Sequence, residues 1–531
     1  MPTDYISYQE SNYFIKIVTD YLDQVPKLQP FYNRFPTLEN FSEQIREKEL
    51  NYNQDNRAIL VNVLLKQYSN IEPSDLTSKN INLLAKNSTF TITTGHQLNL
   101  FTGPLYFLYK IISTINLCKQ LKTEYPKNDF VPIYWMATED HDFDEINYFN
   151  FQSIKIRWAK QNPSGPVGRF PTDDLKIVYE VIEKKLGSSE NAIYLKKLFS
   201  KAYLNNHNLA DATRCLANEL FKNEGLVIID ADNASLKKIF TPYIRNELID
   251  QQAFKQVNQT ISQLKGYDIQ VNPREINLFY ILDNLRERIV FEKDVYKINN
   301  TQIQFTETQI LDELKNHPER FSPNVILRPL YQEVILPNLC YIGGGGEIAY
   351  WLQLQATFNI YQVAFPILLL RNSVLILDKK QSSKADKLAL SYKDLFADQN
   401  QLLKNKTIAK SSITINLEAQ KATLKKQFEY LYQIALATDK SFIGAVKAQE
   451  TKQIKGLENL ERRLLKAQKR VLKDYLDRIV DLQNQLFPNQ SLQERQLNFS
   501  ELYLDHGDLL IKKLLATLKP LENEFNAIVL E

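Results

Sequence analysis

Residues 89–136 contain two short strand-like segments on either side of a helix-length segment, and this order constrains the fold most strongly. Thr89 to Thr94 (TFTITT) predicts a strand because β-branched residues favour extended backbone. Pro104 to Leu121 carries apolar residues at helical spacing, and Val131 to Met136 predicts a second strand. A strand, a helix and a strand in succession form a βαβ unit with parallel strands. The sequence therefore predicts an α/β protein with a mainly parallel sheet.

Further segments extend this core. The other predicted strands are 226–229, 340–342, 364–369 and 374–377. Residues 1–85 predict helices because apolar side chains recur there at helical spacing, from Tyr13 to Val25 and again from Ala58 to Tyr68. Residues 150–330 are less regular and predict inserted connecting segments over the sheet. Residues 1–378 together form the predicted core domain.

Residues 379–505 predict a helical coiled-coil hairpin. One apolar stripe runs from Leu417 to Ala435 and a second from Leu457 to Leu486, with an irregular 4-4 step between Val471 and Ile479. The turn is expected near residues 438–440, and Pro488 ends the second helix. The charged residues between the stripes favour a solvated face over a basic ligand-binding groove. Residues 506–531 predict a C-terminal helix that packs on the core.

Charge and cysteine content exclude several classes of protein. The 531 residues contain 65 Lys and Arg against 62 Asp and Glu, so the net charge of +3 gives no support for nucleic-acid binding. The three cysteines, Cys118, Cys215 and Cys340, lie far apart and form no disulfide framework or CxxC motif, which favours a reducing, cytoplasmic location. No apolar run approaches the roughly 18 residues of a membrane span, and the first residues do not resemble a secretion signal.

The first candidate site is the loop TTGHQLNLFTGP (93–104), which leaves the first predicted strand and enters the helix. Ligands of open α/β sheets bind beyond the carboxyl ends of strands, and helix N-termini attract anions. Thr102 is the predicted N-cap of the helix. We expect a binding loop here, and the alternative is a tight turn with a capping Thr and a structurally satisfied His. The candidate substrate-binding residues are Thr94, Gly95, His96, Gln97, Thr102 and Gly103.

The second candidate site is WMATEDHDFDE (135–145), which follows the next predicted strand. It has five carboxylates within seven residues, and these repel one another unless a helix N-terminus, a metal ion or a substrate ammonium compensates them. We expect a polar substrate pocket rather than a fixed metal, because no pair of His ligands at i, i+4 is present. The candidate catalytic residues are Asp140, His141 and Asp142, and the candidate binding residues are Trp135, Glu139 and Glu145.

The third candidate site is CYIGGGGEIAYW (340–351). Four consecutive glycines allow backbone N–H groups to form an anion-binding nest, and a flexible turn is the alternative. The motif is neither a Walker A nor a GxGxxG sequence. Arg328 and Arg371, on either side of it in the sequence, are candidates to hold a carboxylate with two hydrogen bonds. The candidate binding residues of the motif itself are Gly343, Gly344, Gly345, Gly346, Glu347 and Tyr350.

Four segments in order resemble the cysteine-adding enzymes of bacillithiol biosynthesis, the cysteine ligase BshC family. They are TGHQLNLFTGPLYFLYK, VPIYWMATEDHDFDEIN, YIGGGGEIAYW and GAVKAQETKQIKGLENLERRLLKAQKR. The resemblance covers most of the chain. It implies a Rossmann-like catalytic core, a coiled coil that forms a homodimer, and a ligase that joins L-cysteine to the amine of glucosaminyl malate in the last step of bacillithiol synthesis.

This reaction carries chemical requirements. A free carboxylate and an ammonium do not condense usefully in water, so the cysteine carboxyl needs activation as an adenylate or acyl phosphate, which implies ATP. The sugar amine must lose a proton, for which Asp140, His141 or Asp142 is the expected acceptor. The Gly343–Gly346 nest and the helix mouth at Gly103 are expected to hold malyl carboxylates or a phosphate. Because the cysteines are scattered, no tightly bound metal is expected.

Two other classes of function remain open from the sequence. One is a nucleotide-fold binding protein that senses a ligand and signals through its coiled coil. The other is a metal-dependent phosphotransfer or hydrolytic enzyme built on EDHDFDE. For the coiled coil we expect dimerisation, because Tyr475 and Ile479 are apolar residues that a second copy would bury.

Overall fold

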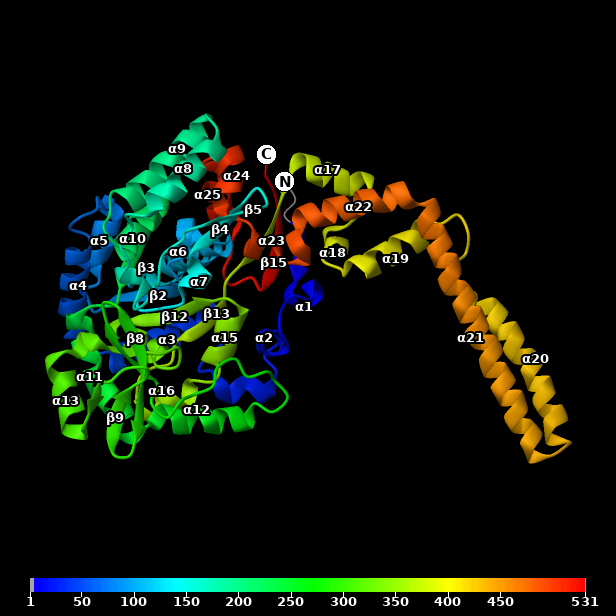
Figure 1. The fold of residues 1–531 in the computed structure, drawn as a ribbon, viewed down its shortest axis with the longest axis horizontal. Coiled ribbons are helices and arrows are strands. Elements are labelled where there is room, and N and C mark those ends of the chain that lie inside the picture. The colour runs from blue at the N-terminus through cyan, green and yellow to red at the C-terminus, as the bar shows by residue number, and fades with distance from the viewer. Residues whose placement is uncertain (1–3, 531) are drawn as a thin grey trace.

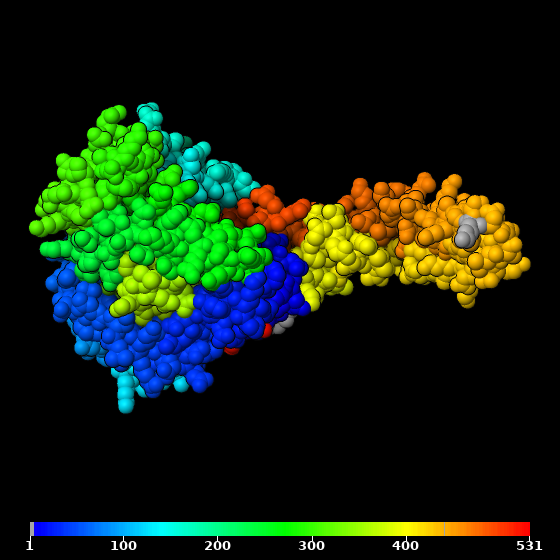
Figure 2. Space-filling view, turned by 90° about the horizontal axis from the view of Figure 1, so that it is seen from below, coloured from blue at the N-terminus to red at the C-terminus, as the bar shows by residue number. Residues whose placement is uncertain are grey.

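The computed structural model describes residues 4–530, and residues 1–3 and 531, which the predicted domain ranges include, lie outside it. Figure 1 shows a large α/β body from which a long helical arm projects. The space-filling view in Figure 2 shows that the outer part of this arm, in orange, stands clear of the body. The two parts correspond to the predicted core and the predicted hairpin.

The central sheet of the body is parallel throughout. Its strand order is β13-β12-β2-β3-β6, and each neighbouring pair runs in the same direction. The strands are β2 (Thr89–His96), β3 (Asp129–Met136), β6 (Val227–Asp230), β12 (Asn338–Gly343) and β13 (Ile367–Leu370). Helix α6 (Tyr106–Glu124) connects β2 to β3 and packs against both. The predicted α/β fold class is confirmed.

Apolar layers cover both faces of this sheet. Along β12, Cys340 and Ile342 belong to one buried cluster, whereas Tyr341 belongs to the other. The first cluster includes Phe41 of α3 (Leu38–Asn51) and Leu117 of α6. Burial on both faces explains why β3, β6 and β13 are apolar along most of their length, whereas β2 alternates apolar residues with buried threonines.

Most of the N-terminal 85 residues are helical, as predicted. The helices are α1 (Tyr8–Ser11), α2 (Lys16–Leu22), α3, α4 (Asn56–Gln67) and α5 (Asp75–Leu83). Between β3 and β12 lie α7 (Phe143–Ile146), α8 (Leu175–Leu186), α9 (Glu190–Phe199), α10 (Leu209–Phe221), α11 (Ala234–Asp250), α12 (Gln252–Gln263), α13 (Glu307–Asn316) and α14 (Arg328–Ile335), together with the two-stranded β4 (Tyr148–Phe151) and β5 (Ile154–Arg157).

The inserted region also builds a second, antiparallel sheet of order β10-β9-β8-β7-β11. Its strands are β7 (Leu278–Leu282), β8 (Leu285–Glu292), β9 (Val295–Ile298), β10 (Gln304–Phe305) and β11 (Phe321–Pro323). The sequence predicted an insertion here but not its strands. This sheet matters for function because it supplies one wall of the cavity described below.

The two ends of the described chain meet in a third sheet. Strand β15 (Glu524–Leu530) pairs in parallel with β14 (Ser373–Asp378) and antiparallel with β1 (Asp4–Ser7). The prediction of a C-terminal helix is therefore only partly correct. Helices α24 (Phe499–His506) and α25 (Leu509–Thr517) precede the strand, and α25 packs on α6, where Asn116 donates to the Leu515 carbonyl at 2.9 Å.

The arm is a hairpin of α20 (Glu418–Leu436) and α21 (Lys440–Val471), with its turn at the predicted position. A small apolar cluster of Phe428, Ala435 and Val446 joins the two helices near the tip. The second helix does not continue to Pro488 without interruption. It ends at Val471, and α22 (Lys473–Leu486) starts in a new direction after Leu472, which is where the irregular 4-4 step lies.

Helix α22 belongs to the base of the arm rather than to a surface awaiting a second copy. It packs against α17 (Lys379–Lys387) and α19 (Gln399–Lys410), close to the short α18 (Tyr392–Leu395). Ile479 is completely buried within the chain, and the Tyr475 hydroxyl donates to the Leu388 carbonyl at 2.9 Å. The expectation that a second copy covers these two residues is wrong.

Among residues 4–530, no helix combines the length and the apolar character that crossing a membrane requires.

Candidate active site

The cavity that gathers the predicted site residues lies at the switch point of the parallel sheet. From β2 the chain continues to β3 and then to β6, toward one edge of the sheet. From β12, which lies on the other side of β2, it continues to β13, toward the other edge. The connections after β2 and β12 therefore leave toward opposite edges of the sheet. Such a crevice at the carboxyl ends of the strands is where open α/β sheets bind ligands. A cavity of about 740 Å³ opens here, lined by Gly95 at the end of β2 and Gly344 after β12.

The cavity brings together residues from all three predicted sites. Those that line it are Gly95, His96, Gln97, Trp135, Glu139, Asp140, Arg328, Gly344, Gly345, Gly346, Glu347, Tyr350 and Arg371. The antiparallel sheet adds Phe279, Arg286, Arg288 and Pro323. Thr94, Thr102, Gly103, His141, Asp142, Glu145 and Gly343 are not among the lining residues.

The glycine run after β12 is shaped around Glu347. A Cβ on Gly343 would stand only 2.8 Å from the Glu347 Cβ, so only glycine lets this side chain fold back over the strand end. The Glu347 carboxylate accepts from the Gly344 N–H at 2.8 Å and from the Tyr341 hydroxyl at 2.5 Å. The Gly344 N–H is thus already satisfied by an acid of the protein itself and is not available to a ligand anion, which differs from the prediction for this one N–H. The following helix α15 (Gly345–Trp351) has seven residues and precedes α16 (Gln355–Ile360).

Lys110 of α6 neutralises Glu347. Its ammonium pairs with the Glu347 carboxylate and donates to the Gly95 carbonyl at 2.7 Å. Burial opposes ionisation of Glu347, but Lys110 and the Gly344 N–H outweigh it, so that the pKa of Glu347 is lowered. The pair therefore connects the end of β2 with the end of β12.

The loop after β2 differs from the prediction at its far end. Thr102 has a φ of 70° and is not the N-cap of α6, which starts at Tyr106. Asn498, which precedes α24, holds this turn by donating to the Phe101 and Gly103 carbonyls at 2.7 and 2.6 Å. Thr94 donates to the Ile342 carbonyl at 2.7 Å and so joins β2 to β12. Thr94 thus joins two strands, whereas Thr102 and Gly103 lie in the turn that Asn498 holds.

His96 lines the cavity from the end of β2. Its ring packs edge-on against Tyr106, with 5.4 Å between ring centroids, and only 8% of the residue is exposed. Burial lowers the pKa of His96 well below its usual value, so the imidazole is neutral at physiological pH. Its Nε2 has no partner within residues 4–530.

The acidic segment 139–145 does not converge on one point. Three of the acids have separate partners: Glu139 pairs with the buried Lys237, Asp144 with Arg157 at 2.5 Å, and Glu145 with the Gln97 amide at 2.7 Å. Asp142 is exposed outside the cavity at the start of the four-residue α7. Only Glu139 and Asp140 line the cavity. No group of three or more His, Cys, Asp or Glu side chains that could hold a metal occurs in the described part of the chain.

Asp140 is held as a carboxylate. Burial opposes its ionisation, but hydrogen bonds from His141 and Gln97 and the nearby Arg286 charge lower its pKa well below the usual range. The Gln97 amide donates to its Oδ2 at 3.0 Å, and Arg286 donates to His141 Nδ1 at 2.7 Å. Burial also opposes ionisation of Glu139, and there it prevails, so the pKa of Glu139 is raised despite the attraction of Lys237.

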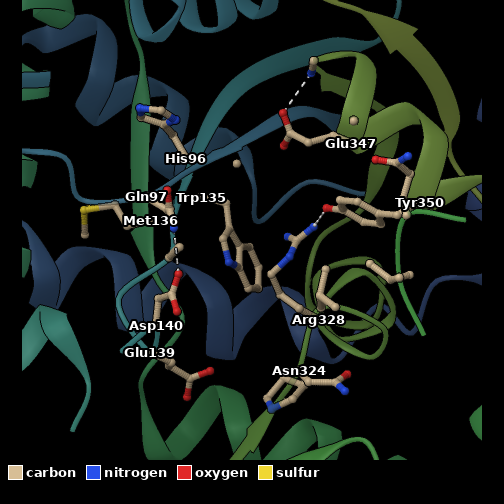
Figure 3. A pocket seen from close by; sticks show the side chains of 18 of the residues that line it. His96, Gln97, Trp135, Met136, Glu139, Asp140, Asn324, Arg328, Glu347 and Tyr350 are labelled. Atoms are coloured by element: carbon tan, nitrogen blue, oxygen red, sulfur yellow. Dashed lines mark hydrogen bonds between the residues drawn. The ribbon is translucent and has the colours of Figure 1, made fainter. Parts of the chain in front are cut away.

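Arg328 faces these acids across the cavity. Figure 3 shows its guanidinium beside the Trp135 ring, with Asp140 and Glu139 on the other side. Its two hydrogen-bond acceptors are both neutral, the Tyr350 hydroxyl at 3.2 Å and the Gln332 amide at 3.0 Å. Because neither acceptor carries charge, the positive charge of Arg328 is left to attract a ligand anion.

Several cavity residues were missed from the sequence. Besides the residues of the antiparallel sheet, they include Tyr106, Lys110, Arg274, Asn324, Tyr341 and Arg495. A lysine among the apolar residues of the first turns of α6 was the one available signal for Lys110. In total, seven lysines and arginines line the cavity, against three acids, Glu139, Asp140 and Glu347.

The parallel sheet, the cavity at its switch point and the attached hairpin define a Rossmann-like enzyme with a coiled-coil domain. Two family models cover the chain: "Bacillithiol biosynthesis BshC, N-terminal Rossmann-like domain" matches residues 1–372 and "Bacillithiol biosynthesis BshC, C-terminal coiled-coil domain" matches residues 374–530. The chain belongs to the BshC family, and it is accordingly an enzyme of the ligase class.

Curated relatives agree over the full length. Proteins named "Putative cysteine ligase BshC" are 63% identical in Flavobacterium johnsoniae, over 100% of both chains, and 60% identical in Flavobacterium psychrophilum, over 99% of both. The protein of that name in Staphylococcus carnosus is 29% identical over 77% of this chain and 79% of its own. A solved Campylobacter jejuni structure titled as an arginyl-tRNA synthetase covers 84% of this chain and 98% of its own at 12% identity and a TM-score of 0.21, which is too low to support an argument.

Proposed function

We propose that this protein joins L-cysteine to the amine of glucosaminyl malate and so completes bacillithiol. Family membership and the names of the relatives support the cysteine ligase activity. The observation that carries the choice of substrate is the charge pattern of the cavity, with Glu139 and Asp140 on one side and Arg328 on the other. Such a cavity suits a ligand that has both an amine and carboxylates.

ATP fits the requirements of this reaction. Formation of an amide from cysteine needs an activated carboxyl, and the cations that line the cavity suit a polyphosphate. When bound, ATP would supply the activation of the carboxyl as an adenylate or acyl phosphate. Arg274, Arg288 and Arg328 are the residues that would hold its phosphates, and the volume of about 740 Å³ lies in the usual range of ligand sites, about 300–1,000 Å³.

The two acids have different roles in this proposal. Asp140, with its lowered pKa, is a weak proton acceptor and binds the substrate ammonium as a counter-ion. Glu139, whose pKa burial raises, is better matched to accept the amine proton near neutral pH. His141 supports the wall through Arg286, since its ring is outside the lining of the cavity.

The proposal includes a homodimer formed through the arm and a cytoplasmic location. Apolar side chains remain exposed along α20 and α21, among them Tyr430, Leu431, Ile434 and Leu460. A second copy of the arm would bury them. All three cysteines are buried and free, which suits a reducing compartment.

The direct test is a reconstituted reaction. The purified protein is incubated with L-cysteine, glucosaminyl malate and ATP, and bacillithiol, AMP and ADP are quantified by mass spectrometry. Bacillithiol that depends on all three substrates is the expected result, and glucosamine in place of glucosaminyl malate is the matched control. In parallel, a strain without the gene should accumulate glucosaminyl malate. Normal bacillithiol in that strain would disprove the proposal.

A further inference from the structure

A buried ion pair links the Rossmann-like domain to the coiled-coil domain at the edge of the cavity. Arg371, just after β13, is 3% exposed, and Glu494 of α23 (Gln493–Gln496) is fully buried. Arg371 donates from Nη1 to Glu494 Oε2 at 3.0 Å and from Nη2 to Oε1 at 2.6 Å. Two parallel hydrogen bonds fix both the position and the plane of a guanidinium.

One donor of Arg371 has no acceptor. Its Nε is buried and has no hydrogen-bond partner within residues 4–530. This atom lies next to the glycine loop, 3.8 Å from where a Cβ on Gly344 would stand. Arg371 and Gly344 both line the cavity, as does Tyr106, whose ring centroid is 5.2 Å from the guanidinium carbon. A buried donor without a partner is costly, which indicates that a ligand atom accepts from it.

The charges around this corner attract an anion. Lys110 is neutralised by Glu347, and Arg371 by Glu494. Arg495, the next residue along α23, also lines the cavity and forms no ion pair with any residue that the structure describes. Its charge is therefore left over at the end of the cavity where the Arg371 Nε is unsatisfied.

We propose that the coiled-coil domain completes the active site. Glu494 is a positioning residue that orients Arg371, so that its Nε donates to an anionic oxygen of a substrate, and Arg495 neutralises the same group. This inference rests on the proposed function for the identity of the ligand. The shared chemistry is an oxygen anion, which is a malyl carboxylate, the cysteine carboxylate or an ATP phosphate.

The test is Glu494→Gln. Glutamine has the size of glutamate but is neutral and has one oxygen in place of two, so it cannot accept both hydrogen bonds from Arg371. Dissociation constants of L-malate, L-cysteine and ATP are measured separately by calorimetry on the full-length protein. We expect the affinity for one of them to fall about 10-fold or more, and that ligand is the occupant. Glu313→Gln is the matched control, because it breaks the Glu313–Arg320 pair at a site that does not line the cavity.

A positioning role for Glu494 also predicts how the effects of two substitutions on ligand affinity combine. Arg371→Lys should weaken binding of the same ligand. Adding Glu494→Gln to Arg371→Lys should lower the affinity little further, because each change alone already removes the Glu494–Arg371 pair. Arg495→Gln, at an exposed residue whose loss should not affect folding, should weaken binding of that ligand alone. If folded Glu494→Gln binds all three ligands as the wild type does, or if the losses add fully, the inference is wrong. Failure of the proposed function would be distinguishable from failure of this inference. In that case the wild type would form no bacillithiol but would still bind an anion with an affinity that depends on Glu494.

Discussion

Lys110 and Glu347 form an ion pair across the switch point of the parallel sheet, and this contact joins two of the three sequence motifs. Lys110 lies on α6 and holds the end of β2, whereas Glu347 lies on α15 and holds the end of β12. The Lys110 side chain is 5% exposed and that of Glu347 24%. The pair sets the distance between the two walls of the cavity.

Removal of one partner should therefore be costly. Lys110→Met leaves the Glu347 carboxylate without its counter-ion, and we expect the free energy of unfolding to fall by about 3 kcal/mol. Lys110→Met combined with Glu347→Gln should recover part of this loss, because no unpaired charge then remains. Chemical denaturation of the wild type and the two variants measures both effects. A double variant as unstable as the single one would contradict the argument.

Asp140 and Asp142 offer a matched pair of substitutions within one segment. Asp140→Asn removes the carboxylate that lines the cavity and that we propose binds the substrate ammonium, and we expect about a 10- to 10²-fold loss of ligase activity in a folded protein. Asp142→Asn removes a carboxylate that is exposed outside the cavity, and activity should stay within about twofold. The rate of bacillithiol formation in vitro and the precursor level in a complemented deletion strain measure both. Equal activity of the two variants would place the amine elsewhere.

Arg328 should determine substrate affinity. Arg328→Lys keeps the positive charge but loses the planar fork that contacts Tyr350 and Gln332. We expect KM for glucosaminyl malate or ATP to rise about 10- to 100-fold, with a smaller change in kcat. Arg320→Lys, at an arginine that pairs with Glu313 away from the cavity, is the control. An unchanged KM for every substrate would show that Arg328 is structural.

Glu247 gives a prediction about pH. It is buried on α11 and accepts from the Asn277 N–H at 2.9 Å, and Asn277 in turn accepts from Asn324 on the cavity wall. Burial raises the pKa of Glu247 from 4.5 to about 7, so the folded state retains a proton that the unfolded chain releases. Its contribution to stability is complete below about pH 4.5 and is lost as the pH rises through 7.

Glu247→Gln cannot ionise and isolates this effect. Relative to the wild type, its free energy of unfolding should increase between about pH 5 and pH 7 and level off above pH 7, because Glu247 then releases its proton in both states. Denaturant titrations at several pH values measure the difference. A constant difference over this range would show that Glu247 does not titrate on unfolding.

The arm should control the oligomeric state. We expect light scattering to give twice the chain mass of 61.9 kDa for the wild type. Leu431→Arg with Ile434→Arg should yield a folded monomer, since both side chains are about 40% exposed on α20. Leu50→Arg, at a leucine that is 91% exposed on the body, is the control and should remain dimeric. A wild-type mass of one chain would rule out the dimer.

The parts of the fold that the sequence predicted are those encoded over a few neighbouring residues. The β-branched run 89–94 and the apolar run 131–136 form β2 and β3, and the turn of the arm lies at residues 437–439, close to the expected 438–440. The loops after β2, β3 and β12 meet in one cavity because parallel strands present their carboxyl ends at the same edge of a sheet. Local periodicity together with this rule of topology was sufficient to predict these strands and the meeting of their loops.

The pairing of charges was decided by the tertiary structure. Five acids in a row suggested a shared ligand, but Lys237, Arg157 and the Gln97 amide, from three different parts of the chain, compensate Glu139, Asp144 and Glu145 individually. Within the anion nest expected at Gly343–Gly346, the Gly344 N–H donates instead to Glu347, whose counter-ion is Lys110. Similarly, Arg371 faces Glu494, which is 123 residues away along the chain. A buried charge takes whichever partner the packing places beside it, and no spacing in the sequence records that choice.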